Sequence, residues 1–376
     1  MTEKIMEFLR AQEPATPCLV VDLDVVAERH ETLKTSLPLA QIFYAVKANP
    51  APEIVSLLIR QGANFDVASR AELDLCQSLG ASPDRISFGN TIKKAGDIAY
   101  AHEKGVRLYT FDSAAELDKI ARHAPGAKVV VRVLVPNLGA EWPLSRKFGC
   151  APDMARDLLL EARERGLVAH GIAFHVGSQQ TNLEAWDAAV EIAARLFRDL
   201  EERGVTLALV NLGGGLPARY RTPVDGIDAY GRAVMHAMTK HFGNDLPAMM
   251  VEPGRYMVAD AGIIQSEVVL ISQKAYDDPT RWVYLDIGRF GGLAETEGEA
   301  IRYEIDTDGE GRETGPVVLA GPTCDSADIL YEKSGYEMPL DLAIGEKIHI
   351  HAAGAYTTTY ASVGFNGFPP LQAYYV

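Results

Sequence analysis

The chain has 376 residues, of which 47% are hydrophobic and 23% charged, and its formal net charge is −15. These fractions are typical of globular proteins, and the negative charge argues against nucleic acid as a partner, because phosphate contacts need basic patches. No apolar run approaches the length of about 18 residues that a membrane span needs, and the N-terminus lacks a signal core. We therefore expect a cytoplasmic protein with no membrane partner. The four cysteines, Cys18, Cys76, Cys150 and Cys324, are scattered, which argues against both a disulfide framework and a zinc site.

Eight short apolar runs follow one another in the first two thirds of the chain, most of them separated by amphipathic stretches with helical spacing. The runs are "IFYAVK", "NFDVAS", "RISFGN", "RLYTFDS", "KVVVRVLV", "GIAFHVGS", "LALVNLGGG" and "AMMVEPGR". Alternating strands and helices are typical of a parallel sheet, and eight such units over roughly 240 residues predict an α/β fold, the closed (β/α)8 TIM-type barrel. We expect this barrel to span residues 23–260.

After the barrel the sequence continues with strand-like runs that have no helices between them, such as "IIQSEVVLISQKAY" and "EKIHIHAAGAYT". This pattern predicts a second, all-β domain of the sandwich or barrel type. The early run "PCLVVDLDVV" precedes the first barrel strand and could join the same sheet. The β domain is therefore expected to comprise residues 1–22 and 261–376.

Each of the eight barrel runs ends in polar or glycine residues. The ends are Lys47, Asp66 with Ser69, Asn90, Asp112, Arg132, His175 with Ser178, Gly213–Gly215, and Glu252 with Arg255. Because the carboxyl ends of all strands in such a barrel meet at one mouth, we expect these residues to converge on a site.

Lys47 ends a buried strand and is followed by the strand-breaking Asn49 and Pro50. Such a lysine is either a surface residue or a nucleophile whose amine, partly desolvated, forms a Schiff base with an aldehyde. The run Gly213–Gly215 is either a simple turn or a backbone cradle for phosphate, and phosphate sites are frequent in this part of a barrel. A carboxylate at Glu252 would hold a pyridine nitrogen protonated. Together these residues favour an aldehyde cofactor that carries a phosphate.

Several other polar residues have two readings. His175, in "FHVGSQ", is either a core histidine or a ring that lies against the cofactor. His349 and His351 share one strand face, but no third ligand is evident in the sequence, so we predict ordinary strand residues and no metal site. Cys324 stands in the turn "LAGPTCDSADILYE", directly before Asp325, and is either structural or a thiol exposed enough to transfer a proton.

Seven motifs together resemble the alanine-racemase-fold, pyridoxal-phosphate-dependent amino-acid decarboxylases, and among these ornithine decarboxylase. They are "FYAVKANP", "FDVASRAEL", "FHVGSQ", "NLGGGLP", "VEPGRYMV", "GPTCDSAD" and "GAYT", in this order between about Cys18 and Phe368. Seven collinear motifs are far more specific than one glycine loop. The resemblance implies pyridoxal 5'-phosphate as cofactor and a homodimer with shared active sites, in which the β domain contributes to the dimer interface and to the site.

The resemblance also implies a role for individual residues. Lys47 resembles the Schiff-base lysine, His175 the residue that stacks on the ring, and Glu252 the partner of the pyridine nitrogen. The residues expected to hold the phosphate are Ser178, Gly214, Gly215, Arg255 and Tyr356. Asp66 and Arg132 resemble the neighbours that position the lysine and the ring.

The second part of the implied site comes from the β domain. Cys324 resembles the residue that protonates the Cα carbanion after carbon dioxide leaves. Asp325 resembles the residue that receives the distal amine of the substrate, and Tyr356 could also contact the substrate. In the family, Cys324 and Asp325 would reach across the dimer into the partner's site.

These expectations describe decarboxylation of a basic L-amino acid, with L-ornithine giving putrescine for polyamine biosynthesis. Lysine, both lysine and ornithine, arginine and carboxynorspermidine remain open as substrates, whereas Asp325 would repel the second carboxylate of diaminopimelate. We expect the distal pocket to involve the segment that holds Glu295, Glu297 and Glu299. A noncatalytic regulator on the same fold, or a racemase with a second base opposite the lysine, are the alternatives from other functional classes.

Overall fold

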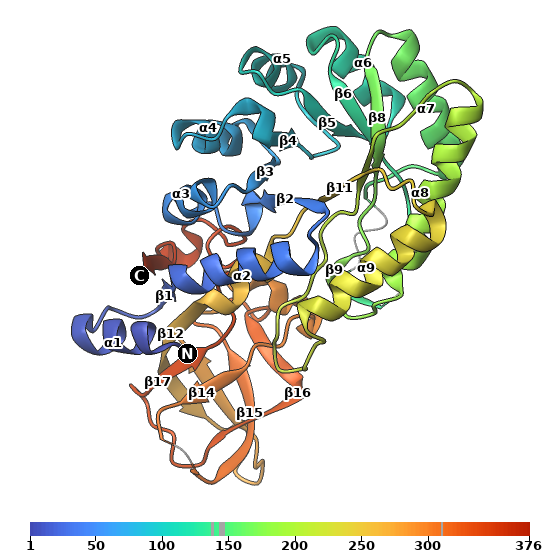
Figure 1. Ribbon diagram of the computed structural model, residues 1–376. Helices are drawn as coiled ribbons and strands as arrows, with labels where there is room; N and C mark the ends of the chain where they lie inside the picture. The colour runs from blue at the N-terminus through green and yellow to red at the C-terminus, as the bar shows by residue number, and fades with distance from the viewer. Residues whose placement is uncertain (137–138, 143–146, 310) are drawn as a thin grey trace. The chain divides into compact units, whose positions relative to one another are not determined.

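The computed structural model describes residues 1–136, 139–142, 147–309 and 311–376 (Figure 1). The chain divides into two compact units, each of which is described by itself. The barrel unit comprises Ala27–Pro217 and Val224–Met257, and the β unit comprises Met1–Val26, Ala218–Pro223 and Val258–Val376. Among the described residues, none of the helices combines the length and the hydrophobicity that crossing a membrane requires.

Eight parallel strands close into a barrel, which confirms the predicted (β/α)8 fold. Around the barrel, each strand pairs with the next along the chain, and β11 pairs with β2 to close the ring. The strands are β2 (Ala40–Ala45), β3 (Asn64–Val67), β4 (Ile86–Phe88), β5 (Leu108–Phe111), β6 (Lys128–Arg132), β8 (Val168–Ala173), β10 (Leu209–Asn211) and β11 (Ala248–Val251). A separate antiparallel pair is formed by β7 (Ala140–Trp142) and β9 (Ser178–Gln180).

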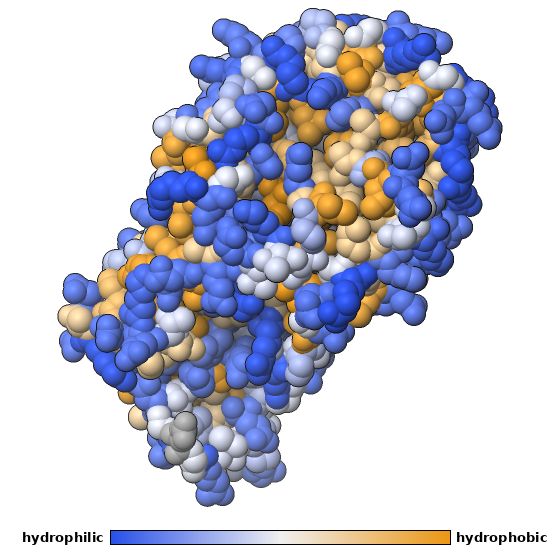
Figure 2. Space-filling model, in the orientation of Figure 1, coloured by the Kyte–Doolittle hydropathy of each residue, from blue (hydrophilic) through white to orange (hydrophobic). Residues whose placement is uncertain are grey.

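Helices connect the strands and surround them, as Figure 1 shows. They are α2 (Leu23–Ser36), α3 (Pro52–Arg60), α4 (Arg70–Ser78), α5 (Ala95–Glu103), α6 (Ala114–His123), α7 (Pro152–Glu164), α8 (Ala185–Glu202), α9 (Ile227–Phe242) and α10 (Arg255–Val258), with short 3-10 turns η1 (Val46–Ala48) and η2 (Pro83–Arg85). Hydrophilic residues cover most of the outer helices in the view of Figure 2, and hydrophobic residues show between them, over the strands. This is the distribution expected of amphipathic helices that pack on a buried parallel sheet.

The interior of the barrel is filled by side chains from several strands. One cluster consists of Phe43, Val130, Ala173, Leu209 and Met250, all nearly or fully buried. Tight packing also sets the local sequence of β8, because a Cβ atom at Gly171 would lie 2.1 Å from the carbonyl oxygen of Leu209. Only glycine fits there without moving backbone.

The β unit contains one connected sheet of eight strands. The central order is β14-β17-β12-β13-β15-β16, while β1 pairs with both β12 and β18. The strands are β1 (Cys18–Val21), β12 (Gly262–Ser272), β13 (Arg281–Leu285), β14 (Ile305–Thr307), β15 (Thr314–Ala320), β16 (Ile329–Pro339), β17 (Lys347–Ile350) and β18 (Gln372–Tyr375). Three 3-10 turns lie between or beside them, η3 (Ala259–Ala261), η4 (Ala294–Glu299) and η5 (Phe365–Gly367).

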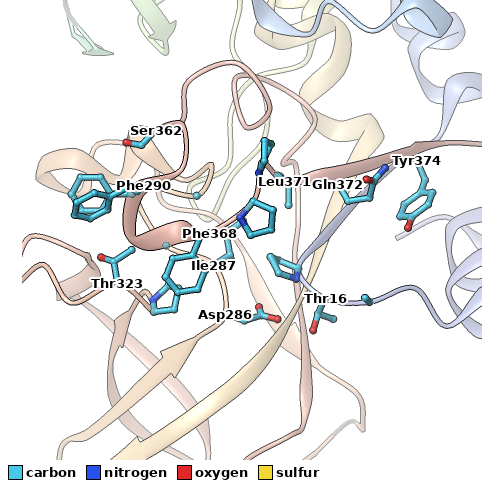
Figure 3. Close-up of a pocket in the computed structure, with 18 residues that line it drawn as sticks. Thr16, Asp286, Ile287, Phe290, Thr323, Ser362, Phe368, Leu371, Gln372 and Tyr374 are labelled. Atoms are coloured by element: carbon cyan, nitrogen blue, oxygen red, sulfur yellow. The ribbon is translucent and has the colours of Figure 1, made fainter.

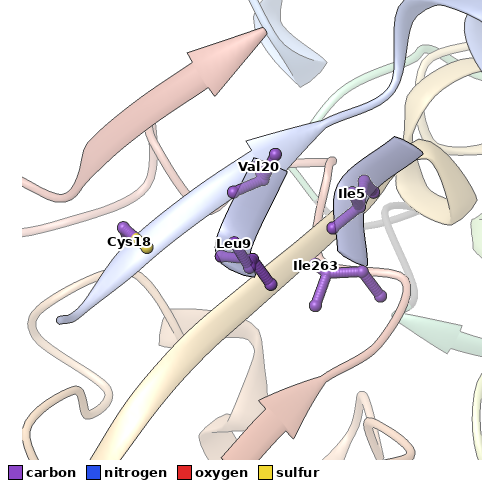
Figure 4. Packing of buried hydrophobic residues seen from close by; sticks show 5 residues of the cluster. All are labelled: Ile5, Leu9, Cys18, Val20 and Ile263. Carbon is purple, nitrogen blue, oxygen red and sulfur yellow. The ribbon is translucent and has the colours of Figure 1, made fainter. Parts of the chain in front are cut away.

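Helix α1 (Glu3–Gln12) covers part of this sheet. Ile5 and Leu9 on the helix pack against Cys18 and Val20 of β1 and Ile263 of β12, as Figure 4 shows. Burial raises the pKa of the Cys18 thiol to about 11. This cysteine is therefore a packed core residue without thiolate character at neutral pH.

Candidate active site

Lys47 lies on the turn η1, immediately after the first barrel strand. The turn is fixed by its neighbours, since the Tyr44 hydroxyl donates to the Asn49 carbonyl over 2.8 Å and the Asn49 side chain accepts from the N–H of Ala51 over 3.2 Å. The Lys47 side chain is 49% exposed, and its Nζ atom lies 3.3 Å from Oδ2 of Asp66. The strand end thus presents a half-exposed amine beside a buried carboxylate.

Asp66, in β3, is the partner of this amine. Burial raises the pKa of Asp66, and the nearby Lys47 opposes that effect. The carboxylate occupies the space beside Gly89, where a Cβ atom would lie 2.0 Å from Oδ1. A glycine after β4 is therefore required for Asp66 to reach the lysine.

His175 follows β8 and is a neutral ring at physiological pH. Burial, with the positive charges of Arg132 and Lys47 nearby, holds the pKa of His175 well below its ordinary value. Its Nδ1 atom accepts a hydrogen bond from the N–H of Gly177 over 3.0 Å, so the ring hydrogen lies on Nε2. A neutral, fixed imidazole is suited to lie against an aromatic ring.

Arg132 ends β6 and is the buried cation of this region. Burial lowers the pKa of Arg132, whereas Glu252, Asp112 and Asp66 act in the opposite direction. Its guanidinium lies 5.5 Å from the centre of the Phe148 ring. The three carboxylates show that Arg132 belongs to the same electrostatic group as the lysine and His175.

Glu252 follows β11 and is held by a strong hydrogen bond from Asn211. The Asn211 Nδ2 atom donates to Oε1 of Glu252 over 2.6 Å. Burial and the like charge of Asp66 raise the pKa of Glu252 to about 7, and Lys47, Asn211 and Arg132 oppose the rise. A carboxylate with this pKa is poised to exchange or share a proton near neutral pH.

The run Gly213–Gly215 follows β10 and packs too closely for side chains. A Cβ atom at Gly213 would lie 2.1 Å from the Phe174 carbonyl, and one at Gly214 would lie 2.7 Å from the carbonyl of Glu252. Gly213 and Gly215 also have positive φ angles of 68° and 101°. Among the residues that the structure describes, the N–H groups of Gly214 and Gly215 donate no hydrogen bond to protein, so they can receive an anion.

Arg255 and Ser178 provide further donors to an anion in the barrel unit. Arg255 is 3% exposed, and its Nη2 atom donates to Oγ of Ser178 over 3.1 Å. Taken with the glycine amides, the amine of Lys47 and the carboxylate of Glu252, this donor set fits pyridoxal 5'-phosphate, which carries an aldehyde, a phosphate and a pyridine nitrogen.

Three other polar strand ends have structural roles instead. The Ser69 hydroxyl caps α4 by accepting from the N–H of Glu72, and Asn90 donates to the carbonyl of Ala68. Asp112 accepts from the N–H of Gly149 over 2.7 Å. The predicted convergence of polar residues at the strand ends is therefore real, but it includes side chains that stabilise the loops.

Cys324 and Asp325 lie in the β unit, and both are exposed. The N–H of Cys324 donates to the side chain of Asn366 over 3.0 Å. The Asp325 carboxylate accepts from the N–H of Ala327. Both side chains are accessible, as reacting groups would have to be.

The shape of this loop depends on Asp328, which the sequence did not single out. Its buried carboxylate accepts from the N–H of Arg289 over 2.7 Å and from both the N–H and the hydroxyl of Thr323, over 3.1 and 2.7 Å. Cβ atoms at Gly288 and Gly321 would approach Asp328 to 2.2 and 2.3 Å. Asp328 thus fixes the turn that carries Cys324.

Tyr356 also lies in the β unit and adopts a strained backbone conformation, with φ of 65°. The left-handed region is unfavourable for a bulky side chain and is often retained at functional positions. The next residue, Thr357, is buried, and its hydroxyl donates to the carbonyl of Ala353 over 2.6 Å. The structure thus holds Tyr356 in a conformation that it would not adopt freely.

The β unit contains a cavity of about 320 Å³ beside the loop of Cys324. Figure 3 shows Phe290 and Thr323 on one side of it and Tyr374 on the other, with the carboxylate of Asp286 between them. Asp286 is the one charged residue among those that line this cavity. It accepts from the Ser266 hydroxyl over 2.6 Å. An apolar cavity with one carboxylate suits an aliphatic cation.

Three glutamates were expected near the distal pocket, and two of them have structural partners. Glu297 pairs with Arg289 over 2.8 Å. Glu299 accepts from the N–H groups of Glu332 and Lys333 over 2.8 and 2.7 Å and so caps β16. Glu295 is buried, and none of the three lines the cavity of Figure 3.

His349 and His351 both bond to Asp306. His351 lies 2.7 Å and His349 3.4 Å from its carboxylate oxygens. Among the described residues, no group of three or more histidine, cysteine or acidic side chains has an arrangement that could hold a metal ion. These histidines connect β17 to the edge strand β14.

Comparison with known proteins gives the family. The pyridoxal binding domain of the pyridoxal-dependent decarboxylases matches residues 23–259. The lysine/ornithine decarboxylase of Selenomonas ruminantium is 37% identical over 370 residues, which cover 98% of this chain and 91% of that protein. The ornithine decarboxylase of Rattus norvegicus is 34% identical over 374 residues, which cover 95% and 80%. The crystal structure of a lysine/ornithine decarboxylase from Vibrio vulnificus, complexed with putrescine, has a TM-score of 0.87 at 30% identity and covers 99% of this chain and 97% of that chain.

These similarities extend over nearly the whole chain, and they agree with the donor set found at the ends of the barrel strands. The chain belongs to the pyridoxal-dependent decarboxylases, and it is an enzyme that uses pyridoxal 5'-phosphate to remove carbon dioxide from a basic amino acid.

Proposed function

We propose that the preferred substrate is L-ornithine, which the enzyme converts to putrescine and carbon dioxide. What carries the proposal is the grouping of Lys47, Asp66, His175 and Glu252 after the barrel strands, beside the glycine run. The similarity to ornithine and lysine/ornithine decarboxylases supports a diamino acid as substrate. Lysine is the second candidate, because one relative with 37% identity acts on both.

In this proposal the barrel unit holds the cofactor. Lys47 binds its aldehyde carbon, His175 lies against the ring, and Glu252 faces the pyridine nitrogen. Asp66 and Arg132 position the lysine and the ring. The phosphate is held by Ser178, Gly214, Gly215, Arg255 and Tyr356.

The bound cofactor supplies an electron sink for the electron pair left at Cα when carbon dioxide departs. The protein must orient the carboxylate of the substrate so that this bond breaks in place of Cα–H. Cys324 then delivers a proton to Cα, and its exposure on the β unit supports this role. Asp325, the next residue, binds the distal ammonium group of the substrate.

We further propose that the enzyme is a homodimer and that Cys324 and Asp325 act in the active site of the partner subunit. The two residues lie in the β unit, whereas the residues assigned to the cofactor, apart from Tyr356, lie in the barrel unit. A two-fold axis would generate two equivalent sites of this kind. The carboxylate of Asp286, in the cavity beside Thr323, adds a second acid that suits a cationic substrate.

Product analysis tests the proposed substrate. The purified enzyme, loaded with pyridoxal phosphate, is supplied with ornithine, lysine, arginine or diaminopimelate in parallel, and the amines are separated and quantified. The highest kcat/KM with ornithine, with putrescine as product, supports the proposal. A higher kcat/KM with lysine would assign the second candidate, and a higher value with either of the other two would refute a diamino acid preference for both candidates.

A further inference from the structure

Asn211 is the last residue of β10, and its side chain links two parts of the proposed cofactor site. The residue is 2% exposed. Its Nδ2 atom donates to Oε1 of Glu252 over 2.6 Å, and its Oδ1 atom accepts from the N–H of Gly213 over 2.9 Å. One side chain thus contacts both the carboxylate after β11 and the first glycine of the run.

The orientation of the Asn211 amide follows from chemistry. A backbone N–H can only donate, so the group that faces Gly213 must be the carbonyl oxygen of the amide. The NH2 group must then face Glu252, whose ionised carboxylate can only accept. The two bonds therefore support each other, and neither can form if the amide is turned around.

We propose that Asn211 is a positioning residue, which orients the Glu252 carboxylate and joins it to the phosphate-binding glycine run. This proposal rests on the proposed roles of Glu252 and of the glycines. A short bond to a charged group is stronger than one between neutral groups. A strand end is also a rigid support, so that the direction of the carboxylate is set before any ligand binds.

The protonation of Glu252 depends on all the charges around it. Asp66 of β3 raises its pKa, whereas Lys47 of η1 and Arg132 of β6 lower it, and burial raises it. His175 is neutral and adds no charge. The hydrogen bond from Asn211 favours the ionised form and so lowers the pKa. If the bond is lost, the pKa of Glu252 rises, and the carboxylate takes up a proton at a higher pH.

Two substitutions separate the two contacts of Asn211. Asn211→Ala removes both the donor to Glu252 and the acceptor for Gly213. Asn211→Asp keeps an acceptor for Gly213 but replaces the donor with a second carboxyl group beside Glu252. Two adjacent carboxyl groups cannot both ionise easily, so the pair takes up its first proton at a raised pH. Asn64→Ala, which loses a side-chain bond to the carbonyl of Ile42 at the start of β3, is the control.

Carboxyl protonation is measured by infrared difference spectroscopy on the apoenzyme, and cofactor affinity by fluorescence titration with pyridoxal phosphate. Both variants of Asn211 should move the carboxyl titration upward by about one to two pH units, the usual effect of one bond to a charged group. The acid limb of the kcat profile should move in the same direction, with KM little changed. Asn211→Ala alone should also weaken cofactor binding, because it leaves the Gly213 amide without an acceptor.

A titration of Asn211→Asp that matches wild type would overturn the proposal, and it would leave Asn211 with a structural role at Gly213 only. Equal shifts in Asn64→Ala would overturn it as well, since they would reflect a general loss of barrel stability. Failure of the proposed role of Glu252 is detected separately with Glu252→Gln. If this variant keeps wild-type kcat while the apoenzyme titrations shift as expected, the link between Asn211 and Glu252 stands and the assigned role of Glu252 falls.

Discussion

Gly214→Ala is the sharpest test of the proposed phosphate cradle. The added Cβ atom would lie 2.7 Å from the carbonyl oxygen of Glu252 and 3.2 Å from Nε2 of His175. Glu252 cannot retreat easily, because its N–H donates to the carbonyl of Gly213 over 2.9 Å. Overpacking of this kind costs about 1–3 kcal/mol. If relief of the clash displaces these groups, the affinity for pyridoxal phosphate should fall roughly 5- to 150-fold, since about 1.4 kcal/mol corresponds to a factor of ten.

The assay is equilibrium titration of the apoenzyme with pyridoxal phosphate, together with urea unfolding of the same preparations. Two glycines serve as controls because a Cβ atom at either meets nothing within 4 Å. Gly96→Ala, in α5, should leave cofactor affinity unchanged and stability equal or higher. Gly126→Ala has a φ of 73° and should lose stability through backbone strain alone, again without weaker cofactor binding. Wild-type affinity in Gly214→Ala would refute the assignment of this glycine to the cofactor site.

Four further results are expected. Borohydride reduction of the holoenzyme, followed by peptide mapping, should place the pyridoxyl group on Lys47, and a label on another lysine would contradict the assignment. Asp325→Ala should raise KM for diamino acids by about 30-fold or more, because removing one partner of a desolvated charge pair costs at least about 2 kcal/mol; an unchanged KM would remove Asp325 from the substrate site. Asp328→Ala should lower the free energy of unfolding by about 2–5 kcal/mol in urea, because it leaves buried donors without an acceptor, and a loss below about 0.5 kcal/mol would contradict its role in the loop. Mixing Lys47→Ala with Cys324→Ala under conditions of subunit exchange should restore about a quarter of the wild-type activity, because half of the dimers are mixed and each has one intact site; proven exchange without recovery would exclude shared sites.

The fold could be predicted because its pattern is local and repeated. Each barrel strand is a short buried run followed by an amphipathic helix, and a parallel order around the ring follows from that alternation. The polar ends of the strands also identified Lys47, Asp66 and Glu252 as neighbours, which the structure brings together. The same rule could not separate these residues from Ser69, which only caps a helix.

The remaining features depend on contacts between distant parts of the sequence. Asn211 reads as the end of a strand, and nothing local indicates that its amide meets a residue 41 positions later. Asp325 and Asp328 stand three residues apart in "CDSAD", yet one carboxylate is exposed and the other is buried and accepts three hydrogen bonds. Glu299 was expected near the distal pocket, but its carboxylate caps β16. Periodicity gives the face of a residue, and only the folded chain gives its partner.

The division of the site between two units has a consequence for reaction specificity. Lys47, Glu252 and the glycine run would bind the cofactor equally well for breaking the bond to the carboxylate or the bond to the Cα hydrogen, so they do not choose between decarboxylation and racemisation. That choice depends on the group that meets Cα, which we assign to Cys324, on a loop whose turn is held by the buried carboxylate of Asp328. Cofactor affinity and reaction outcome should therefore respond to different substitutions. Changes around Asn211 and Gly214 should alter the first, whereas changes around Asp328 should alter the second while pyridoxal phosphate still binds.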